Sequence, residues 1–186
     1  YAKQHPRELK YGHGGVGTIN HLVSVFFEQS AGINIQQVPF RGEGESITEL
    51  LGGHVQLIFV NPMSVKEHVK SGTLRVLAVA DEQRLIDPVF SDVPTLKEMG
   101  IDVAINNWQA IAAQKNLPAD VKAKLAAGLK AIVNDPKFMS DMEITGMRVE
   151  YLGPHELEEK WLSDNQKLSK IVHETGILDL IKAQKK

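Results

Sequence analysis

Apolar residues along the chain alternate between short continuous runs and longer stretches with helical spacing. In the first 80 residues the short runs predict strands over residues 8–11, 33–38, 55–60 and 74–80. The stretches between them predict helices over residues 19–30, 46–51 and 62–71. Connections rich in Gly and Pro join each strand to its helix. This alternation predicts an α/β fold with a mostly parallel sheet flanked by helices.

After residue 80 the pattern predicts mainly helices. Thr95 opens a short helix that Gly100 closes, and residues 101–113 form an extended crossing between domains. We then expect helices over residues 118–133, 136–146 and 154–175, with one strand at residues 147–152. The apolar faces of these helices have no sheet of their own to cover. We therefore expect a chain that lacks N-terminal strands, with a second copy, a swapped chain or further polypeptide on these faces.

One connection carries the strongest functional signal. Gly12, Gly14, Gly15 and Gly17 fall within six residues, and an apolar helix follows at once. Glycine lets a ligand approach the backbone closely. The first turn of a helix leaves N–H groups unpaired at the positive end of the helix dipole. This combination predicts an anion site, which we interpret as a site for a carboxylate.

The same glycines also fit the dinucleotide pattern G-x-G-x-x-G. Arg41 lies near the place of a contact to a 2′-phosphate. However, Leu9-Lys10-Tyr11 is a poor central strand, and Pro39 closes the next strand without an acid for the ribose. A carboxylate receptor is therefore the preferred hypothesis, and a nucleotide-dependent enzyme domain is the alternative.

Composition narrows the function further. The 186 residues include 21 Lys and Arg against 23 Asp and Glu, so no basic excess points to nucleic acid. Cysteine is absent, which excludes disulfides and thiolate catalysis. Neither Gly-x-Ser-x-Gly nor His-Glu-x-x-His occurs, and His13 and His21 lack the sequence partners of a metal site. We therefore expect no enzyme, no cofactor and no metal.

Several motifs follow one another in an order that is characteristic of one family. The glycine loop leads to His21-Leu22, residues 38–42 read Val-Pro-Phe-Arg-Gly, and residues 50–55 read Leu-Leu-Gly-Gly-His-Val. Further matching segments are Asp92-Val93-Pro94-Thr95, Glu98-Met99-Gly100 and Trp108. Together they resemble the substrate-binding proteins of tripartite tricarboxylate transporters, the TctC or Bug family. The resemblance covers essentially the whole chain.

The resemblance implies a periplasmic-binding-protein-like, Venus-flytrap receptor in the bacterial periplasm. Such a receptor binds a small carboxylate between two lobes and delivers it to membrane subunits of the transporter. Residues 1–105 would form the second ligand-binding lobe, and residues 106–186 a crossing segment and helices of the first lobe. The chain begins without an apolar leader, so we expect the signal peptide to be absent from it. The expected ligand contacts are His13, Gly14, Gly15, Val16, Gly17, Thr18, His21, Gly42, Val60 and Asn61.

Two departures from the family's pattern bear on the ligand. Family members commonly carry small hydroxyl residues where this chain has His13 and Gly14, and a protonated His13 would supply a donor and a charge. Many relatives carry an acid at the place of Val60, just before Asn61. With Val60 the site lacks a partner for an amino group. The hypothesis is therefore a plain carboxylate or an apolar-tailed acid, and not an amino acid.

Overall fold

A computed structural model describes residues 1–105, 108–144 and 149–184. The chain divides into two compact units. Residues 1–106 and 170–186 form the first, here called the sheet unit, and residues 107–169 form the second, called the helical unit. Residues 106 and 107 of the predicted crossing segment lie outside the described residues. The assignment of residues 1–105 and 106–186 to two receptor lobes stays a prediction.

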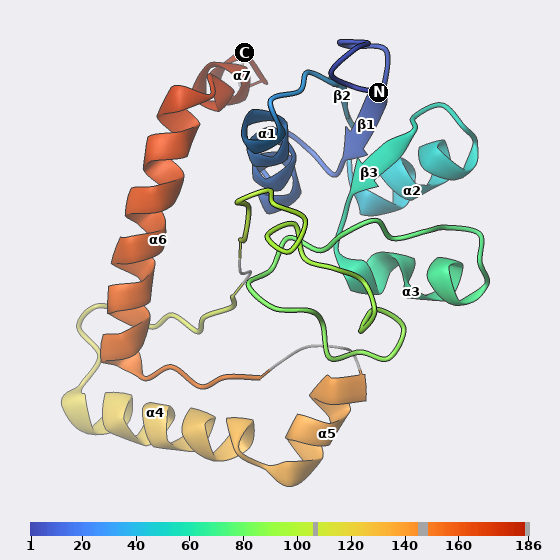
Figure 1. Cartoon of the computed structure of the whole chain (residues 1–186). Helices are drawn as coiled ribbons and strands as arrows, with labels where there is room; N and C mark the ends of the chain where they lie inside the picture. The colour runs from blue at the N-terminus through green and yellow to red at the C-terminus, as the bar shows by residue number, and fades with distance from the viewer. Residues whose placement is uncertain (106–107, 145–148, 185–186) are drawn as a thin grey trace. The chain divides into compact units, whose positions relative to one another are not determined.

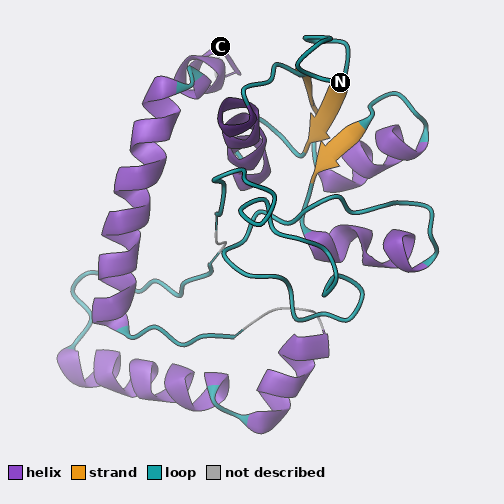
Figure 2. Ribbon diagram, viewed as in Figure 1, coloured by secondary structure: helices purple, strands orange, loops and turns teal. Residues whose placement is uncertain are grey.

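The sheet unit is built on three parallel strands in the order β2-β1-β3 (Figure 1, Figure 2). The strands are β1 Lys10–His13, β2 Gln36–Pro39 and β3 Leu57–Phe59. Each strand is followed by a helix: α1 Ile19–Ala31, α2 Glu43–Leu51 and α3 Pro62–Lys70. The register pairs His13 with both Pro39 and Phe59, so the strands end level at their carboxyl edge. These three strand–helix units confirm the predicted parallel α/β sheet.

Capping chemistry sets the ends of α1 and α3 where the sequence predicts them. The Thr18 hydroxyl accepts a hydrogen bond from the His21 N–H at 3.4 Å. Gly32 ends α1 in the left-handed region, at a φ of 61°. The Asn61 side chain accepts from the Met63 N–H at 3.0 Å and so caps α3. Both caps depend on residues adjacent in sequence, which explains why they can be predicted.

The two faces of β1 pack against different helices. Tyr11 and His13 face α1, where the Tyr11 hydroxyl donates to the Glu28 carboxylate at 3.2 Å. Gly12 faces α2, and a Cβ at this position would stand 2.5 Å from the Ser46 Oγ. The missing side chain therefore lets α2 lie directly on the central strand. Figure 1 shows α1 on one side of the strands and α2 and α3 on the other.

Helix α2 begins earlier than the sequence predicts, at Glu43 and not at Ser46. The glycines on either side of Glu43 are typical of a loop, which is why the prediction was late. In the structure Glu43 and Glu45 place carboxylates in the first helical turn. Negative charge is favourable there because it opposes the positive end of the helix dipole.

Two elements predicted over residues 74–100 are wrong. The segment over residues 74–80 forms only an isolated bridge between Val79 and Thr95. Leu77 in this segment is 62% exposed, so its apolar alternation does not face a sheet. The short helix predicted after Thr95 is a series of turns. Thr95 and Glu98 exchange the two hydrogen bonds of a capping box, but Gly100 ends the segment before regular helix forms.

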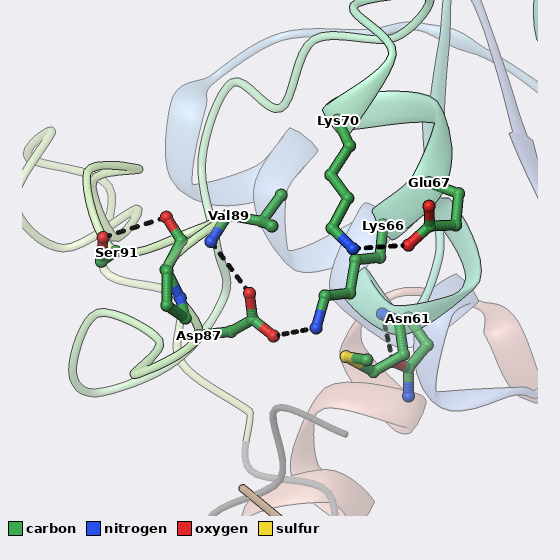
Figure 3. Close-up of polar contacts among 9 residues, drawn as sticks. Asn61, Lys66, Glu67, Lys70, Asp87, Val89 and Ser91 are labelled. Carbon is green, nitrogen blue, oxygen red and sulfur yellow. Dashed lines mark hydrogen bonds and ion pairs between the residues drawn. The ribbon is translucent and has the colours of Figure 1, made fainter. Parts of the chain in front are cut away.

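A buried ion pair fixes the polar connection over residues 81–92 to α3 (Figure 3). Asp87 is 2% exposed and accepts hydrogen bonds from the Lys66 Nζ at 2.5 Å and from the Val89 N–H at 2.9 Å. Burial raises the pKa of Asp87, but the bonds from Lys66 and Val89 outweigh it and hold the pKa below its ordinary value. The connection therefore has a defined path although it contains no helix or strand.

The helical unit holds the long helices that the sequence predicts. They are α4 Ala119–Val133, α5 Pro136–Ile144 and most of α6 Pro154–Glu174. The Trp108 indole N–H donates to Asp164 at 2.8 Å, and its ring lies 5.6 Å from that of Trp161. The predicted end of a helix at Gly146 lies outside the described residues, as do the first two residues of the predicted strand 147–152. Residues 149–152, the described part of this predicted strand, have an irregular backbone.

Apolar side chains remain exposed on the helical unit. None of the residues of α4 is buried, and Leu125 and Ile132 on this helix are 50% and 53% exposed. These side chains form the uncovered apolar faces that the sequence leads us to expect. A second copy or a swapped chain on these faces stays a prediction, which sedimentation of the purified protein tests. No helix in the described ranges is long and apolar enough to cross a membrane.

A further helix, α7 Ile177–Gln184, follows α6 and belongs to the sheet unit. It was not predicted, because the pattern after Gly176 is too short to distinguish a helix from a terminal coil. Ile177 is fully buried, which shows that the first turn of α7 is packed.

Candidate functional site

The carboxyl edge of the sheet brings together three connections. Residues 14–18 follow β1, residues 40–42 follow β2 and residues 60–61 follow β3. The strands are parallel and end level, so all three connections leave from the same edge. In open parallel α/β sheets this edge is where ligands bind. The ten contact residues expected from the sequence lie on these connections, on the last residue of β1 or in the first turn of α1.

A hollow of about 520 Å³ opens between the first two connections. Its lining consists of Gly14, Gly15, Val16, Pro39, Phe40, Arg41 and Glu45. The Arg41 N–H donates to the Glu45 carboxylate at 2.9 Å, which orients the backbone of this wall. The hollow is thus lined by the glycine turn, by the aromatic residue Phe40 and by two residues of opposite charge, Arg41 and Glu45. An anion with an apolar part fits this combination.

Two buried histidines lie under the glycine turn. The imidazole rings of His13 and His21 are stacked, with centroids 4.4 Å apart, and both residues are 0% exposed. The Nδ1 of His21 accepts from the Gly17 N–H at 3.1 Å, and its Nε2 lies 2.8 Å from the Gln37 Oε1. This pairing assigns the proton of His21 to Nε2, which donates to Gln37.

The electrostatics of the pair favour uncharged rings. The pKa of His13 is lowered to about 4, chiefly by burial and next by the neighbouring His21, while hydrogen bonds to Gly15 and Gln37 oppose this shift. Burial also lowers the pKa of His21. The interpretation that His13 adds a positive charge to the loop is therefore corrected: near neutral pH both rings are neutral. His13 Nε2 is buried without a hydrogen-bond partner among the described residues.

The N–H groups of the turn are divided between internal bonds and open positions. The Gly17 N–H bonds to His21. The Nδ1 of His13 lies 3.0 Å from the Gly15 carbonyl oxygen and 3.3 Å from the Gly15 nitrogen, and its tautomer decides whether it donates to the first or accepts from the second. The N–H groups of Gly14 and Val16 form no hydrogen bond with the residues that the structure describes. These two residues line the hollow. They are the donors of the turn that remain for a ligand.

Three expected contact residues have structural roles. Thr18 caps α1 and donates from its hydroxyl to the Gly15 carbonyl at 2.8 Å. Gly42 is the N-cap of α2 and has no side-chain capping bond. Asn61 caps α3. Val60, directly after β3, is half-buried. As ligand contacts, all of these stay predictions.

Sequence reasoning missed the most connected polar group at this edge, the carboxylate of Glu43. Its Oε1 accepts from the Asn20 side-chain amide at 2.5 Å and from the Asn61 N–H at 3.0 Å. Its Oε2 accepts from the Ser64 hydroxyl. Glu43 therefore joins the first turns of α1, α2 and α3. A Cβ on Gly14 would stand 3.2 Å from the Glu43 nitrogen, so the glycine turn touches this residue directly.

The signal that could have found Glu43 is an acid directly after the glycine that precedes a helix. Its three partners are 23, 18 and 21 residues away in sequence, so no local pattern indicates them.

The dinucleotide alternative is not favoured by the geometry. In that fingerprint the first glycine forms the tight turn after the strand. Here Gly12 lies inside β1, and its missing side chain accommodates α2. Gly12, the first glycine of the pattern, therefore serves the packing of α2 on β1.

Comparison with known proteins identifies the family. The model for the tripartite tricarboxylate transporter family receptor, TctC, matches residues 1–177. A UPF0065 protein of Agrobacterium vitis, encoded in the TAR-I ttuE-ttuC' intergenic region, is 27% identical over 94% of this chain and 51% of its own length. Protein BugT of Bordetella pertussis is 26% identical over 94% of this chain and 53% of its own. The chain thus spans about half the length of these curated relatives.

Solved structures agree with this result. A TctC solute-binding protein from Polaromonas, solved without ligand, superposes with a TM-score of 0.76 at 29% identity, over 93% of this chain and 59% of its own. A protein of R. palustris solved with adipate gives a TM-score of 0.82 at 25% identity, over 95% and 58%. The matched family consists of solute-binding receptors and not of enzymes, which confirms the class expected from the sequence. The chain therefore belongs to the tripartite tricarboxylate transporter receptor family.

Proposed function

We propose that this chain forms part of a periplasmic receptor that binds a small carboxylate at the carboxyl edge of the β2-β1-β3 sheet. The edge would be one wall of a cleft between two lobes, with residues 1–105 in the second lobe. The receptor would deliver the ligand to membrane subunits of a tripartite tricarboxylate-type transporter. Family membership supports this role, as does the similar R. palustris protein solved with adipate.

The observation that carries the proposal is the pair of open N–H groups at Gly14 and Val16. They line the hollow at the start of α1, where the helix dipole favours an anion. One carboxylate of the ligand would accept hydrogen bonds from both. Arg41 would add a positive charge, and the ring of Phe40 would contact the carbon chain of the ligand.

The proposal is tested by a thermal-shift and calorimetric screen of the full-length protein that contains this chain. The probes are mono-, di- and tricarboxylates, with NAD and NADP for comparison. We expect one class of carboxylate to raise the melting temperature and the dinucleotides to have no effect. A shift with a dinucleotide alone would overturn the proposal.

A pair of variants connects binding to the hollow. Arg41→Gln removes the guanidinium at its wall, and we expect it to weaken carboxylate binding about tenfold, as is typical for a hydrogen bond to a charged group. Arg75→Gln removes an exposed arginine elsewhere in the sheet unit and is the matched control. Equal affinity in the two variants would place the ligand outside the hollow.

A further inference from the structure

The carboxylate of Glu43 is held as a fixed anion at the carboxyl edge. Three donors contact it: the side-chain amide of Asn20, the N–H of Asn61 and the hydroxyl of Ser64. All three belong to the first turns or caps of helices α1 and α3, and one of them, the Asn61 N–H, is a backbone group at a helix start. The protein therefore fills this set of donors with its own side chain.

The charge of Glu43 is not neutralised by a neighbouring cation. All three donors are uncharged groups, and no salt bridge joins Glu43 to a basic side chain within the described residues. Glu43 is half-buried, so solvent still reaches part of the side chain. The edge near Asn61 consequently carries a negative charge, while the hollow is lined by two residues of opposite charge, Arg41 and Glu45.

The hydrogen-bond count of the carboxylate leaves room for a donor from outside the chain. An ionised carboxylate has about four acceptor positions, two on each oxygen. Oε1 of Glu43 uses two, for Asn20 and Asn61, whereas Oε2 uses one, for Ser64. The remaining position on Oε2 suits an N–H or O–H group. A second carboxylate next to it would find its donors occupied and would face a like charge.

We propose that Glu43 determines the charge of the second polar group of the ligand. The ligand has one carboxylate, bound at Gly14 and Val16, and a hydrogen-bond donor, preferably an ammonium, that meets Glu43. Dicarboxylates of the same length are disfavoured. This inference rests on the proposed function, because it names the ligand class of the same site. It also replaces the hypothesis drawn from Val60, since Glu43 supplies the acid that Val60 does not.

Matched ligands of equal chain length test the proposal by calorimetry on the full-length protein. The six-carbon series is 6-aminohexanoate, adipate and hexanoate, and the four-carbon series is 4-aminobutanoate, succinate and butanoate. In the native protein we expect the amino acid of at least one series to bind about tenfold or more tightly than its dicarboxylate. A native preference for the dicarboxylate in both series would overturn the proposal.

Substitution of Glu43 then assigns the preference to this residue. Glu43→Gln keeps the shape but removes the charge, and we expect it to reduce the ratio of amino acid to dicarboxylate affinity by about tenfold. Glu43→Asp retains the charge, and we expect it to retain most of the preference. Glu49→Gln removes one charge from the far end of α2 and is expected to leave the ratio unchanged.

The outcomes separate this inference from the proposed function. If carboxylates bind and Glu43→Gln leaves the affinity ratio unchanged, the inference fails while the receptor function stands. If no carboxylate of any class binds, the proposed function fails as well. Should Glu43→Gln not fold, Ser64→Ala frees an acceptor position but keeps the charge. The proposal then requires the preference for the ammonium to persist in that variant, and its loss would overturn it.

Discussion

Two connections at the carboxyl edge lead from a strand to a helix and differ in how their polar groups are satisfied. In the connection after β1, the N–H groups of Gly15 and Gly17 turn toward buried, uncharged histidines. In the connection after β2, Gly42 has no side-chain cap, and Glu43 and Glu45 bring carboxylates into the first turn of α2. Both contain glycine, yet the first packs on neutral histidine rings and the second leads into a helical turn with two carboxylates.

The difference shows that the number of N–H groups in a glycine-rich turn does not by itself make the turn an anion site. Part of the N–H groups after β1 are used by the protein itself, which leaves Gly14 and Val16. The charge of the site comes from the connection after β2, where Arg41, Glu43 and Glu45 lie within five residues. On the two proposals above, Gly14 and Val16 after β1 and Arg41 after β2 would bind the carboxylate, whereas Glu43 at the start of α2 would select the second group of the ligand.

Among the variants that test this contrast, substitution of His13 is expected to change the free energy of unfolding the most. The pKa of His13 is lowered from 6.5 to about 4, chiefly by burial, so an unfolded chain binds a proton that the folded chain does not. The contribution of the neutral His13 to the free energy of unfolding is fully present above pH 6.5 and is lost as the pH falls toward 4. In His13→Asn, which cannot titrate, we expect the loss of unfolding free energy between pH 7 and 4.5 to be smaller by about 2–3 kcal/mol.

Urea unfolding at the two pH values measures this difference. His54→Asn removes an exposed imidazole and is the matched control. If the native protein and His13→Asn lose the same free energy on acidification, His13 is not kept neutral by the fold.

The next largest change in the free energy of unfolding is expected where Gly14 packs against the start of α2. A Cβ on Gly14 would stand 3.2 Å from the backbone nitrogen of Glu43, which cannot move without shifting the start of α2. We expect Gly14→Ala to lower the free energy of unfolding by about 1–2 kcal/mol. At Gly42 no atom lies within 4 Å of the added Cβ, and Gly42→Ala should cost less, about 0.5 kcal/mol, because alanine is a poorer N-cap residue than glycine. Comparable losses in both variants, measured by urea unfolding, would contradict this.

The effect of the carboxylates in the first turn of α2, here called the acidic turn, is tested through Glu45. Its carboxylate accepts from the Arg41 N–H at 2.9 Å and lies in the first turn of α2. Glu45→Ala removes both the bond and the charge, and we expect a loss of about 0.5–1 kcal/mol. Glu45→Gln retains an acceptor for the bond, so the difference between the variants measures the effect of charge on the helix dipole. That difference should shrink in high salt.

The smallest effect is expected from a substitution that adds a side-chain cap to the connection after β2. Gly42 has an extended backbone with a φ of −178°, which any residue adopts. Gly42→Ser should place a hydroxyl where it accepts from an N–H of the first turn, and should raise the free energy of unfolding by about a few tenths of a kcal/mol. Thermal unfolding detects this as a small rise in melting temperature. A fall would indicate that the acidic turn already occupies the capping position.

The sequence allows the three strand–helix units of the sheet to be predicted, because their signals are local. Thr18, Gly32 and Asn61 mark helix ends through bonds to residues close in the chain. The strand predicted over residues 74–80 is wrong, because alternating apolar residues also occur in a half-exposed coil that pairs only at Val79.

The connections that carry the candidate site were also predictable, but their internal bonds were not. Glu43 bonds to residues on two other helices, and the stacking of His13 on His21 depends on how α1 packs against β1. Neither relation has a fixed spacing in sequence. Tertiary packing also decides which N–H groups of the glycine turn remain open, so residue types alone could not identify Gly14 and Val16.

The order of the strands also determines when each part of this edge is assembled during folding. Pairing of β1 with β2 joins Lys10 to Gln36 across 26 residues, whereas pairing with β3 joins Tyr11 to Leu57 across 46. The shorter loop closes at the lower entropic cost, and contacts nearer in sequence form earlier. The glycine turn is therefore expected to form in an early β1–α1–β2 nucleus. Asn61 and Ser64 arrive only when β3 and α3 dock, so the carboxylate of Glu43 is expected to acquire its full set of partners after the β1–α1–β2 nucleus has formed.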